Sequence, residues 1–507
     1  MTGSFYKNYV LEFTAFVCGA VVMVYEIIGS RLLAPFIGTS TYVWTSLIGV
    51  ILASLSVGYW YGGRLADRKP DIKILAAVIL FAGGLISATA MTKEIFLSKI
   101  ASMPLGLDLK SVFAALVLFA PASICLGMVT PFAVRLRMTA VETTGRTVGR
   151  VYALSTVGSI VGTFGAGFFL IPFIGSVRTL YLIAAALIAA ALLTAPFVFS
   201  AKNISILVIF AFGVAGTEAN IYIVREKGGI IDVDTEYSRF EIVTTTDPTT
   251  GRSIRALAFD PFIVQSAMFL DSDELVFEYP RYYHLVSHFK PDFRTTLIIG
   301  GAGYTYPKEF VRTYPQANIE VVEIDPRMTQ VARDQFRLTD SPRLAIVHED
   351  GRMFINEAPS SKYDAVFMDV AGSLFTIPYH ITTVEAVRNI SRILKDDGVV
   401  IFNMGSSITG EGSHLLQSEL RTYSEIFPHV YLFKIKPEMA DDHLQNLIIL
   451  ATRSTHEDLS SRDPEIARLL SHRYTADLPL EDASLTDDLA PVEYYNSLAQ
   501  NVYLAGR

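Results

Sequence analysis

The chain is poor in cysteine. Only Cys18 and Cys125 occur among its 507 residues, and both lie in apolar runs. Their spacing is not that of paired metal ligands, and two cysteines in such runs do not make a disulfide framework. The cysteines therefore imply neither a disulfide-stapled fold nor a zinc site, and the sequence shows no cluster of metal ligands.

Charge is also scarce, but only in the first part of the chain. Residues 1–225 hold 16 of the 42 Lys and Arg residues and 8 of the 50 Asp and Glu residues, a net charge of +8. The remaining 282 residues therefore carry 26 basic and 42 acidic side chains, a net charge of −16. The first composition is typical of a membrane-embedded segment, and the second is typical of a water-soluble domain. This excludes a single soluble domain, a disordered chain and a generic nucleic-acid binder, because the basic residues are confined to short stretches between apolar runs.

Long apolar runs fill the first part. A helix needs about 20 apolar residues to cross the hydrocarbon core of a bilayer. Runs of that length occur at 10–36, 43–63, 72–92, 111–134, 150–174, 178–199 and 203–224. They predict a multi-span α-helical membrane domain over residues 1–225, hence a multi-pass protein of the cell membrane with the lipid bilayer as a partner. In the fifth run Gly158, Gly162, Gly165 and Gly167 predict close packing between helices.

After residue 225 the pattern changes. Residues 230–262 are short, alternating and rich in Thr, Val and Ile, with a turn signal at Asp247-Pro248, and predict a small antiparallel β subdomain over 226–290. From 291 to 507 strands alternate with helices. The predicted strands are 296–299, 319–324, 344–347, 363–368 and 399–403, and the predicted helices lie near 308–313, 327–336, 383–394 and 414–426. Such alternation predicts an α/β Rossmann-like domain with a mostly parallel sheet, in which ligands bind beyond the carboxyl ends of the strands.

Residues that could bind a ligand or take part in catalysis lie at the ends of those predicted strands. The first strand runs into Gly300-Gly301-Ala302-Gly303, where missing side chains let the backbone approach a ligand. Glu323 ends the second strand, at the offset from the glycine turn where an acid accepts hydrogen bonds from ribose hydroxyls. Asp350, followed by Gly351, comes after the third strand, and Asp369 comes after the fourth. Together they predict a nucleoside site.

In this order the glycine turn, Val-Glu-Ile-Asp at 322–325, Glu-Asp-Gly-Arg at 349–352 and Tyr-Asp-x-x-x-x-Asp at 363–369 resemble the aminopropyltransferase family, the spermidine synthases. The match covers about residues 226–505, and the N-terminal helices resemble the membrane-fused branch of that family. Further matching positions are Gln265, Tyr282, His288 and the segment 486–493.

The resemblance implies transfer of an aminopropyl group from decarboxylated S-adenosylmethionine, the cosubstrate, to an amine, with release of methylthioadenosine. By position, Glu323 would hold the ribose, Asp350 the adenine, and Asp369 would help to deprotonate the amine. The implied cosubstrate-binding set is completed by Gln265, Gly300, Gly301, Gly303 and Gly351. Tyr282 and His288 would contact the amine. An independent argument supports the role of Asp369, since an amine attacks the carbon beside a sulfonium only with a free lone pair.

The sequence departs from the pattern of the resembling family at two positions that are expected to bind the amine. Soluble synthases usually carry an acid in the glycine turn, where this chain has Gly303, and a second acid three residues after the catalytic one, where it has Gly372. Because those acids hold the cationic ends of a polyamine, putrescine is in doubt as the acceptor. The run 374–380 lies where a lid over the amine is expected, and Tyr379 or His380 in it are candidates for replacement contacts.

Two other functions stay open. A methyltransferase using intact S-adenosylmethionine would need nearly the same nucleoside contacts. A non-catalytic polyamine or nucleoside sensor or transporter is favoured by Glu26 and Glu218 within apolar runs, and opposed by Asp369.

The orientation of the chain poses a conflict. The basic clusters at 63–69 and 135–150 favour the cytoplasm. Seven spans would then leave the second part outside the cell, whereas a cosubstrate made in the cytosol requires a cytoplasmic catalytic domain, which is the placement we expect. The early sheet commonly pairs subunits in the resembling family, so a homodimer is a further expectation.

Overall fold

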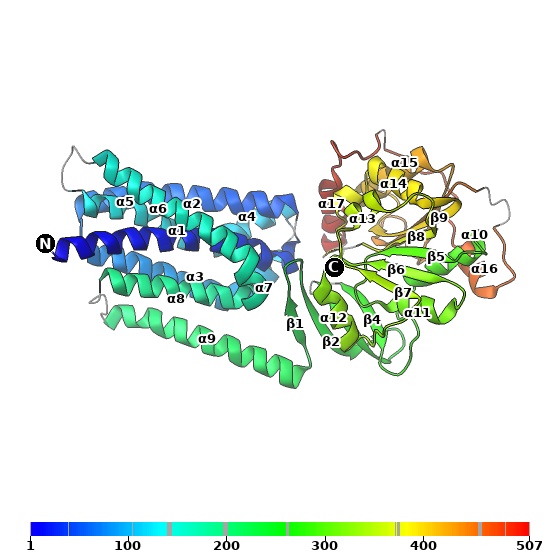
Figure 1. Ribbon diagram of the computed structural model, residues 1–507, viewed down its shortest axis with the longest axis horizontal. Coiled ribbons are helices and arrows are strands. Elements are labelled where there is room, and N and C mark those ends of the chain that lie inside the picture. The colour runs from blue at the N-terminus through cyan, green and yellow to red at the C-terminus, as the bar shows by residue number, and fades with distance from the viewer. Residues whose placement is uncertain are drawn as a thin grey trace. The chain divides into compact units, whose positions relative to one another are not determined.

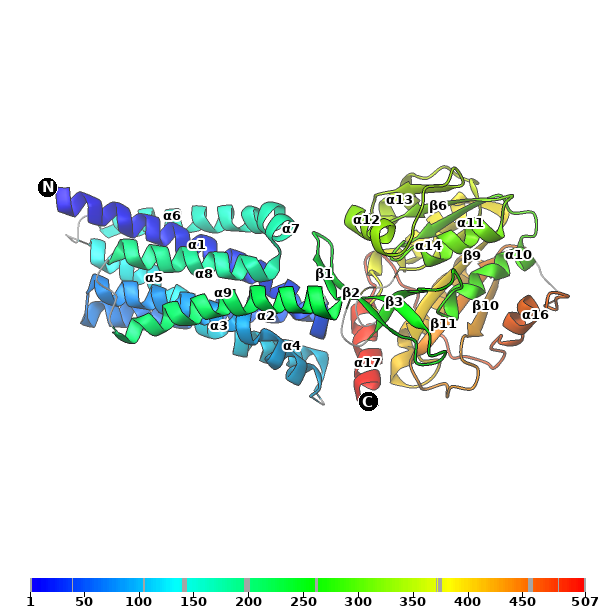
Figure 2. The same cartoon turned by 90° about the horizontal axis from the view of Figure 1, so that it is seen from below.

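The chain divides into two compact units, residues Met1–Arg239 and Phe240–Arg507. The computed structural model (Figures 1 and 2) describes residues 2–38, 40–103, 105–138, 144–195, 201–259, 263–370, 372, 376–454, 459–481 and 483–505. The sequence predicts a boundary after residue 225. The structure places it after Arg239, because the last helix of the first unit continues to Gly228 and a short strand follows it.

The first unit is helical. Each of the seven predicted apolar runs coincides largely with helix, and residues 196–199 of the sixth run lie outside the described residues. The helices are α1 (Thr2–Ile37), α2 (Thr41–Arg68), α3 (Ile72–Ala101), α4 (Leu107–Leu118), α5 (Ala120–Arg137), α6 (Thr144–Gly165), η2 (Ala166–Leu170), α7 (Ile171–Ile174), α8 (Ser176–Thr194) and α9 (Ala201–Gly228), and β1 (Ile231–Asp234) follows. The fourth run is broken, since α4 and α5 meet at an angle of 56° beside Pro121, which opens α5.

Five helices in the described part of this unit are long and apolar enough to cross a membrane, and six are if α4 and α5 count as one span. In α9 the qualifying apolar segment is shorter, Ile204–Asn220. Two of the four predicted packing glycines, Gly158 and Gly162, explain how α6 packs on α1, whereas the prediction is wrong for Gly165 and Gly167, where an added Cβ atom would have no neighbour within 4 Å. A Cβ atom on Gly158 would lie 2.0 Å from the backbone oxygen of Phe16, and one on Gly162 would lie 2.3 Å from that of Ala20. The two helices therefore approach closely because these side chains are missing.

The second unit begins with a small antiparallel sheet. Strands β2 (Arg239–Thr246), β3 (Ser253–Ala258) and β4 (Val264–Phe269) pair in sequence order. The turn between β2 and β3 is closed by Asp247, whose carboxylate accepts from the amide of Thr250 at 2.8 Å. This is the predicted turn, in which an aspartate side chain satisfies the backbone.

The main sheet has seven strands in the order β10-β11-β9-β8-β5-β6-β7. Its parallel part consists of β5 (Thr295–Ile299), β6 (Asn318–Val322), β7 (Leu344–Val347), β8 (Tyr363–Met368) and β9 (Leu394–Ser406), and β10 (His429–Lys434) and β11 (Gln445–Thr452) add an antiparallel edge that the sequence did not predict. The predicted Rossmann-like architecture is thus present.

Helices cover both faces of this sheet (Figure 1). One core is built with residues from η4 (Tyr279–Leu285), α10 (Val286–Phe289), α11 (Thr305–Thr313), α12 (Pro326–Gln335) and α16 (Pro464–Ser471). The other core draws on α13 (Gly351–Glu357), α14 (Val384–Ile393), α15 (His414–Ile426) and α17 (Val492–Ala505). All residues of β8 and residues 398–406 of β9 are buried, as expected of strands that are covered on both faces.

Candidate functional site

The glycine turn after β5 is pressed against the end of β8. Gly300 has a φ of +99°, and a Cβ atom on it would lie 2.2 Å from the backbone oxygen of Asp369. Only glycine fits both constraints. Because β5 pairs in parallel with β6 and β8, and β6 with β7, the predicted residues at four strand ends share one edge of the sheet.

Glu323, which follows β6, holds the glycine turn in place. Its Oε2 accepts from the amides of Gly301 at 2.9 Å and Ala302 at 3.1 Å, and its Oε1 accepts from the amide of Asp325 at 3.0 Å. Three of the roughly four acceptor positions of the carboxylate are thus used within the protein. Burial, with 8% of the residue exposed, raises the Glu323 pKa, and these amides oppose that rise. One acceptor position on Oε1 remains for a ligand hydroxyl.

Asp350 caps α13, which begins at Gly351. Its Oδ1 accepts from the amides of Arg352 at 2.9 Å and Met353 at 3.1 Å, a regular N-terminal cap. Its Oδ2 lies 3.5 Å from Nε2 of His380. The structure therefore brings two predicted site residues together, since His380 was assigned to the lid over the amine and Asp350 to the adenine.

Asp369 follows β8 and is surrounded by neutral donors. Asn403 of β9 donates from Nδ2 to Oδ1 at 3.1 Å, and the Tyr279 hydroxyl donates to Oδ2 at 3.4 Å. Burial raises the pKa of Asp369 to about 6, against the opposing effect of Asn403, Tyr283 and Tyr279. A carboxyl group with such a pKa is mostly ionised at neutral pH and can still take up a proton, as a general base requires.

An aromatic wall of η4 faces this carboxylate. The rings of Tyr279 and Tyr283 meet edge to face with centroids 6.2 Å apart, and Tyr283 contacts Tyr306 at 4.8 Å and Phe367 at 5.2 Å. The Tyr283 hydroxyl has no well-aligned hydrogen-bond partner in the described part of the chain, yet it lies near enough to Asp369 to lower the pKa of that carboxyl. Tyr279, Tyr283 and Asn403 were not predicted from the sequence, although the two tyrosines lie one helical turn apart around the predicted Tyr282.

Tyr282 and His288, which were also predicted to contact the amine, have described contacts away from Asp369. The Tyr282 hydroxyl is buried and donates to the backbone oxygen of Lys434 at 2.9 Å, and it lies 2.6 Å from Nδ1 of His472. His288 is half-buried in α10 with its ring against Phe289. No hydrogen bond that the structure describes joins either residue to Asp369, so their role with the amine stays a prediction.

Gln265 of β4 reaches the loop after β8, where its Nε2 donates to the backbone oxygen of Gly372 at 2.9 Å. Gly303 packs on β4 as well, and a Cβ atom on it would lie 2.4 Å from Oγ of Ser266. Both residues thus join the small sheet to the site edge. A Cβ atom on Gly372 would lie 2.6 Å from Oγ1 of Thr376, so a larger residue at this position would require the Thr376 side chain to move.

The predicted lid is only partly described, because residues 371 and 373–375 lie outside the described residues. Tyr379 is about half exposed, and its ring contacts that of His380 edge to face at 5.6 Å. The late segment 486–493 also reaches the site edge, where Asp487 forms an ion pair of 2.8 Å with Arg352.

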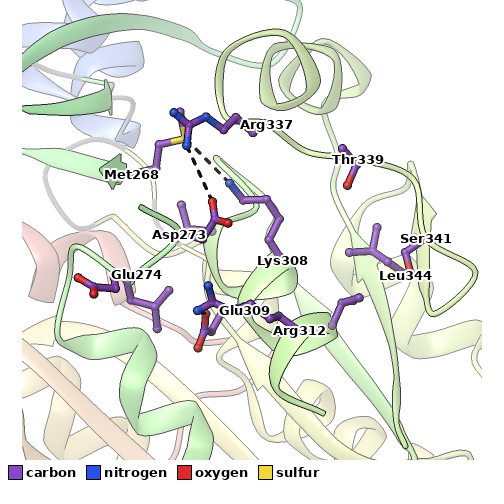
Figure 3. A pocket seen from close by; sticks show the side chains of 13 residues that line it. Met268, Asp273, Glu274, Lys308, Glu309, Arg312, Arg337, Thr339, Ser341 and Leu344 are labelled. Carbon is purple, nitrogen blue, oxygen red and sulfur yellow. Dashed lines mark hydrogen bonds and ion pairs between the residues drawn. The ribbon is translucent and has the colours of Figure 1, made fainter. Parts of the chain in front are cut away.

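A separate pocket of about 200 Å³ lies between β4, α11 and the start of β7 (Figure 3). Lys308 in it lies 4.0 Å from the sulfur of Met268 and donates to the backbone oxygen of Phe336, and burial lowers its pKa to about 8. None of the predicted site residues lines this pocket. Within the described ranges, no group of three His, Cys, Asp or Glu side chains is arranged to hold a metal ion.

Comparisons with known proteins agree on the second unit. Residues 277–454 match the family model of the spermine/spermidine synthase domain. A polyamine aminopropyltransferase of Vibrio vulnificus is 32% identical over 152 residues, which are 30% of this chain and 49% of that protein. An N-terminal histidine N-methyltransferase of Emericella nidulans is 32% identical over 163 residues, 30% of this chain and 27% of that protein. The matched stretches thus span half or less of these relatives' own length.

One relative extends further. A polyamine aminopropyltransferase 1 of Streptomyces coelicolor is 24% identical over 433 residues, 79% of this chain and 76% of that protein, so the similarity must reach into the helical unit. Among solved structures, a probable spermidine synthase of Corynebacterium glutamicum covers 54% of this chain and 94% of its own, with 23% identity and a TM-score of 0.41. The domain match, together with the glycine turn and the acids at the strand ends, shows that residues 277–454 form a spermine/spermidine synthase domain.

Proposed function

We propose that the protein is an aminopropyltransferase that moves the aminopropyl group of decarboxylated S-adenosylmethionine to an amine. The amine nitrogen forms a bond to the carbon beside the sulfonium, the carbon–sulfur bond breaks, and its electron pair leaves with methylthioadenosine. The amine proton passes to Asp369. The observation that carries the proposal is the half-buried Asp369 carboxylate, which is surrounded by neutral donors, has a pKa of about 6 and lies on the same sheet edge as Glu323 and Asp350.

The surroundings of Asp369 suit this step. An ammonium group and a sulfonium repel each other, so the nucleophile must lose a proton before it attacks. The causes that set the Asp369 pKa include no neighbouring charge, only burial, the hydrogen bonds from Asn403 and Tyr279, and the nearby Tyr283 hydroxyl. The negative charge of Asp369 is therefore left to the incoming amine. The sulfonium leaving group becomes neutral as it departs and needs no acid.

A methyltransferase is the second candidate, favoured by the similarity to the N-terminal histidine N-methyltransferase. Glu323 and Asp350 would bind the nucleoside of intact S-adenosylmethionine equally well. The difference lies in the methionine carboxylate, which a methyltransferase must bind with a donor and an aminopropyltransferase should repel. The sensor or transporter is less favoured, because Glu218 is already paired with Arg178 through two hydrogen bonds of 2.8 and 2.9 Å.

Product identity separates these functions. The purified full chain is incubated with either intact or decarboxylated S-adenosylmethionine and with a panel of mono-, di- and triamines, and the products are identified by mass spectrometry. We expect an aminopropylated amine from the decarboxylated cosubstrate alone. A methylated product from the intact cosubstrate would establish the methyltransferase instead, and nucleoside binding without any product would favour the sensor.

We also propose that the helical unit is embedded in the cell membrane as a multi-pass domain. Five or six of its described helices have the necessary length and composition, and large apolar side chains such as Trp60, Phe81 and Phe168 are exposed on them. Water would make such a surface unfavourable. The protein should therefore stay in the pellet after alkaline carbonate extraction, and its recovery in the aqueous fraction would refute the membrane assignment.

The two ends of the helical unit bear on its orientation. Asp67 pairs with Arg135, and Glu12 pairs with Arg137 and Arg150, so the main basic clusters gather at one end. At the other end Asp234 of β1 accepts from the amide of Ser176 at 2.8 Å, and the chain leaves the unit there.

We keep the catalytic domain in the cytoplasm, because its cosubstrate is made there, and the basic clusters then face outward, against the usual charge bias. A C-terminal fluorescent-protein fusion should then fluoresce, whereas activity of a C-terminal alkaline phosphatase fusion would place the domain outside. The expected homodimer stays a prediction.

A further inference from the structure

Two side-chain amides connect the antiparallel edge of the main sheet to the site. Asn446 of β11 donates from Nδ2 to Oδ1 of Asn403 at 3.0 Å, and Asn403 of β9 donates from Nδ2 to Oδ1 of Asp369 at 3.1 Å. Strands β11, β9 and β8 are neighbours in the sheet. The chain of donors therefore runs across three adjacent strands and ends on the carboxylate.

The donor-to-acceptor direction of these two hydrogen bonds determines which group of Asn403 faces Asp369. An ionised carboxylate only accepts hydrogen bonds, whereas an amide presents a donor on one side and an acceptor on the other. If the Asn403 amide turned by half a rotation, its oxygen would face the carboxylate oxygen and its NH2 group would face the NH2 group of Asn446. Asn403 is only 6% exposed, so water is poorly placed to replace the two lost bonds.

We propose that Asn446 is a positioning residue, which fixes the Asn403 amide so that its NH2 group, and not its oxygen, faces Asp369. The inference rests on the proposed function for its catalytic meaning. Asn446 itself makes no described hydrogen bond to Asp369 and acts through Asn403. The antiparallel edge of the sheet, which the nucleoside-binding strand ends do not require, thereby has a part in the chemistry.

The titratable groups that face Asp369 are few. Tyr279 and Tyr283 of η4 are the ones that contribute to its pKa, and both are neutral at physiological pH because burial raises their pKa further. Asn403 is the neutral group from β9. A donor to the ionised form lowers the pKa of a carboxyl group, and an acceptor turned toward it raises that pKa. Loss of the orientation of Asn403 should therefore make Asp369 harder to ionise.

The test replaces Asn446 by Leu, which has a similar size and no donor. Asn446→Asp serves as a second variant, since it also lacks a donor and attracts the Asn403 NH2 group away from Asp369. The matched control is Asn389→Leu. Asn389 donates to Oδ1 of Asn356 at 3.1 Å, an amide pair of the same kind at an exposed position.

The primary readout does not need activity. Infrared spectra of the full chain are recorded across pH, and the carboxyl band of Asp369 is identified by its absence in Asp369→Asn. We expect its midpoint to rise by roughly one pH unit in Asn446→Leu, by more in Asn446→Asp, and to stay at the parental value in Asn389→Leu. An unchanged midpoint in both Asn446 variants, or an equal rise in the control, would overturn the proposal.

Aminopropyl transfer provides the second readout. The acid limb of the pH profile of kcat should move upward in parallel with the infrared midpoint, a change that a merely structural role of Asn446 would not produce. A parent chain that transfers no aminopropyl group would refute the proposed function. The infrared shift would still decide the orientation of Asn403 in that case, so the two failures are distinguishable.

Discussion

Replacing Asp369 by Asn tests whether this residue takes the proton from the attacking amine. With a pKa of about 6, about nine in ten Asp369 carboxyl groups are ionised at pH 7 and about one in ten at pH 5. The asparagine keeps the size of the side chain and one acceptor, but it cannot take a proton from the amine. Loss of a general base typically costs 10²- to 10⁴-fold in rate, or about 2.7 to 5.4 kcal/mol of transition-state stabilisation. We expect a fall in kcat within that range.

The pH dependence gives the sign of the effect. Activity should rise with pH through about 6, because the base works only when Asp369 is ionised. Asp369→Asn should lack this limb. Methylthioadenosine affinity, measured by calorimetry, should hardly change, because the proposed nucleoside contacts come from Glu323 and Asp350. Asp334→Asn, an exposed change on α12, is the matched control and should behave as the parent does.

Two results would refute this reasoning. If Asp369→Asn turns over at the parental rate, Asp369 is not the general base, and Tyr379 or His380 becomes the candidate for that role. A variant in which methylthioadenosine affinity falls as far as turnover would show that Asp369 serves binding and not proton transfer.

Three further changes test other parts of the account. Glu323→Ala removes a ribose acceptor and the anchor of the Gly301 amide, so the methylthioadenosine Kd should rise about 5- to 150-fold, for a loss of 1 to 3 kcal/mol, and an unchanged Kd by calorimetry would exclude the nucleoside pose. Gly300→Ala places a Cβ atom 2.2 Å from the Asp369 backbone, so both Tm and turnover should fall, and parental values of both would contradict the packed turn. Glu419 is 0% exposed and neither carboxylate oxygen has a described hydrogen-bond partner, so burial raises its pKa and the stability of the folded state falls as pH rises above the unfolded value of about 4.3. Glu419→Gln should therefore raise Tm more at pH 8 than at pH 5, and an equal gain at both pH values would show that Glu419 is not held protonated.

Much of the fold was accessible from the sequence, because its signals are local. Apolar runs of helical length and the alternation of strands and helices depend on residues near one another in the chain. The predicted strands 344–347 and 363–368 agree with β7 and β8, and the predicted helix 414–426 agrees with α15. The strands β10 and β11 were missed, because their antiparallel place beside β9 depends on pairing with distant residues.

The site was predicted where a strand end supplies the residue. Glu323, Asp350 and Asp369 each follow a strand, and parallel pairing brings them to one edge. The neighbours of Asp369 were not predicted, because Tyr279 and Asn403 reach it from elements 90 and 34 residues away along the chain. The resemblance pointed to Tyr282, whose hydroxyl is bonded to Lys434 and His472.

A single-turnover reaction tests the central claim most directly. The full chain is mixed with decarboxylated S-adenosylmethionine that carries deuterium in its aminopropyl group and with the preferred amine, and both products are quantified by mass spectrometry. We predict an amine that has gained the deuterated aminopropyl group, with one methylthioadenosine released for each, and no such product from Asp369→Asn on the same timescale. A methyl group gained from intact S-adenosylmethionine, with no transfer from the decarboxylated compound, would contradict the account.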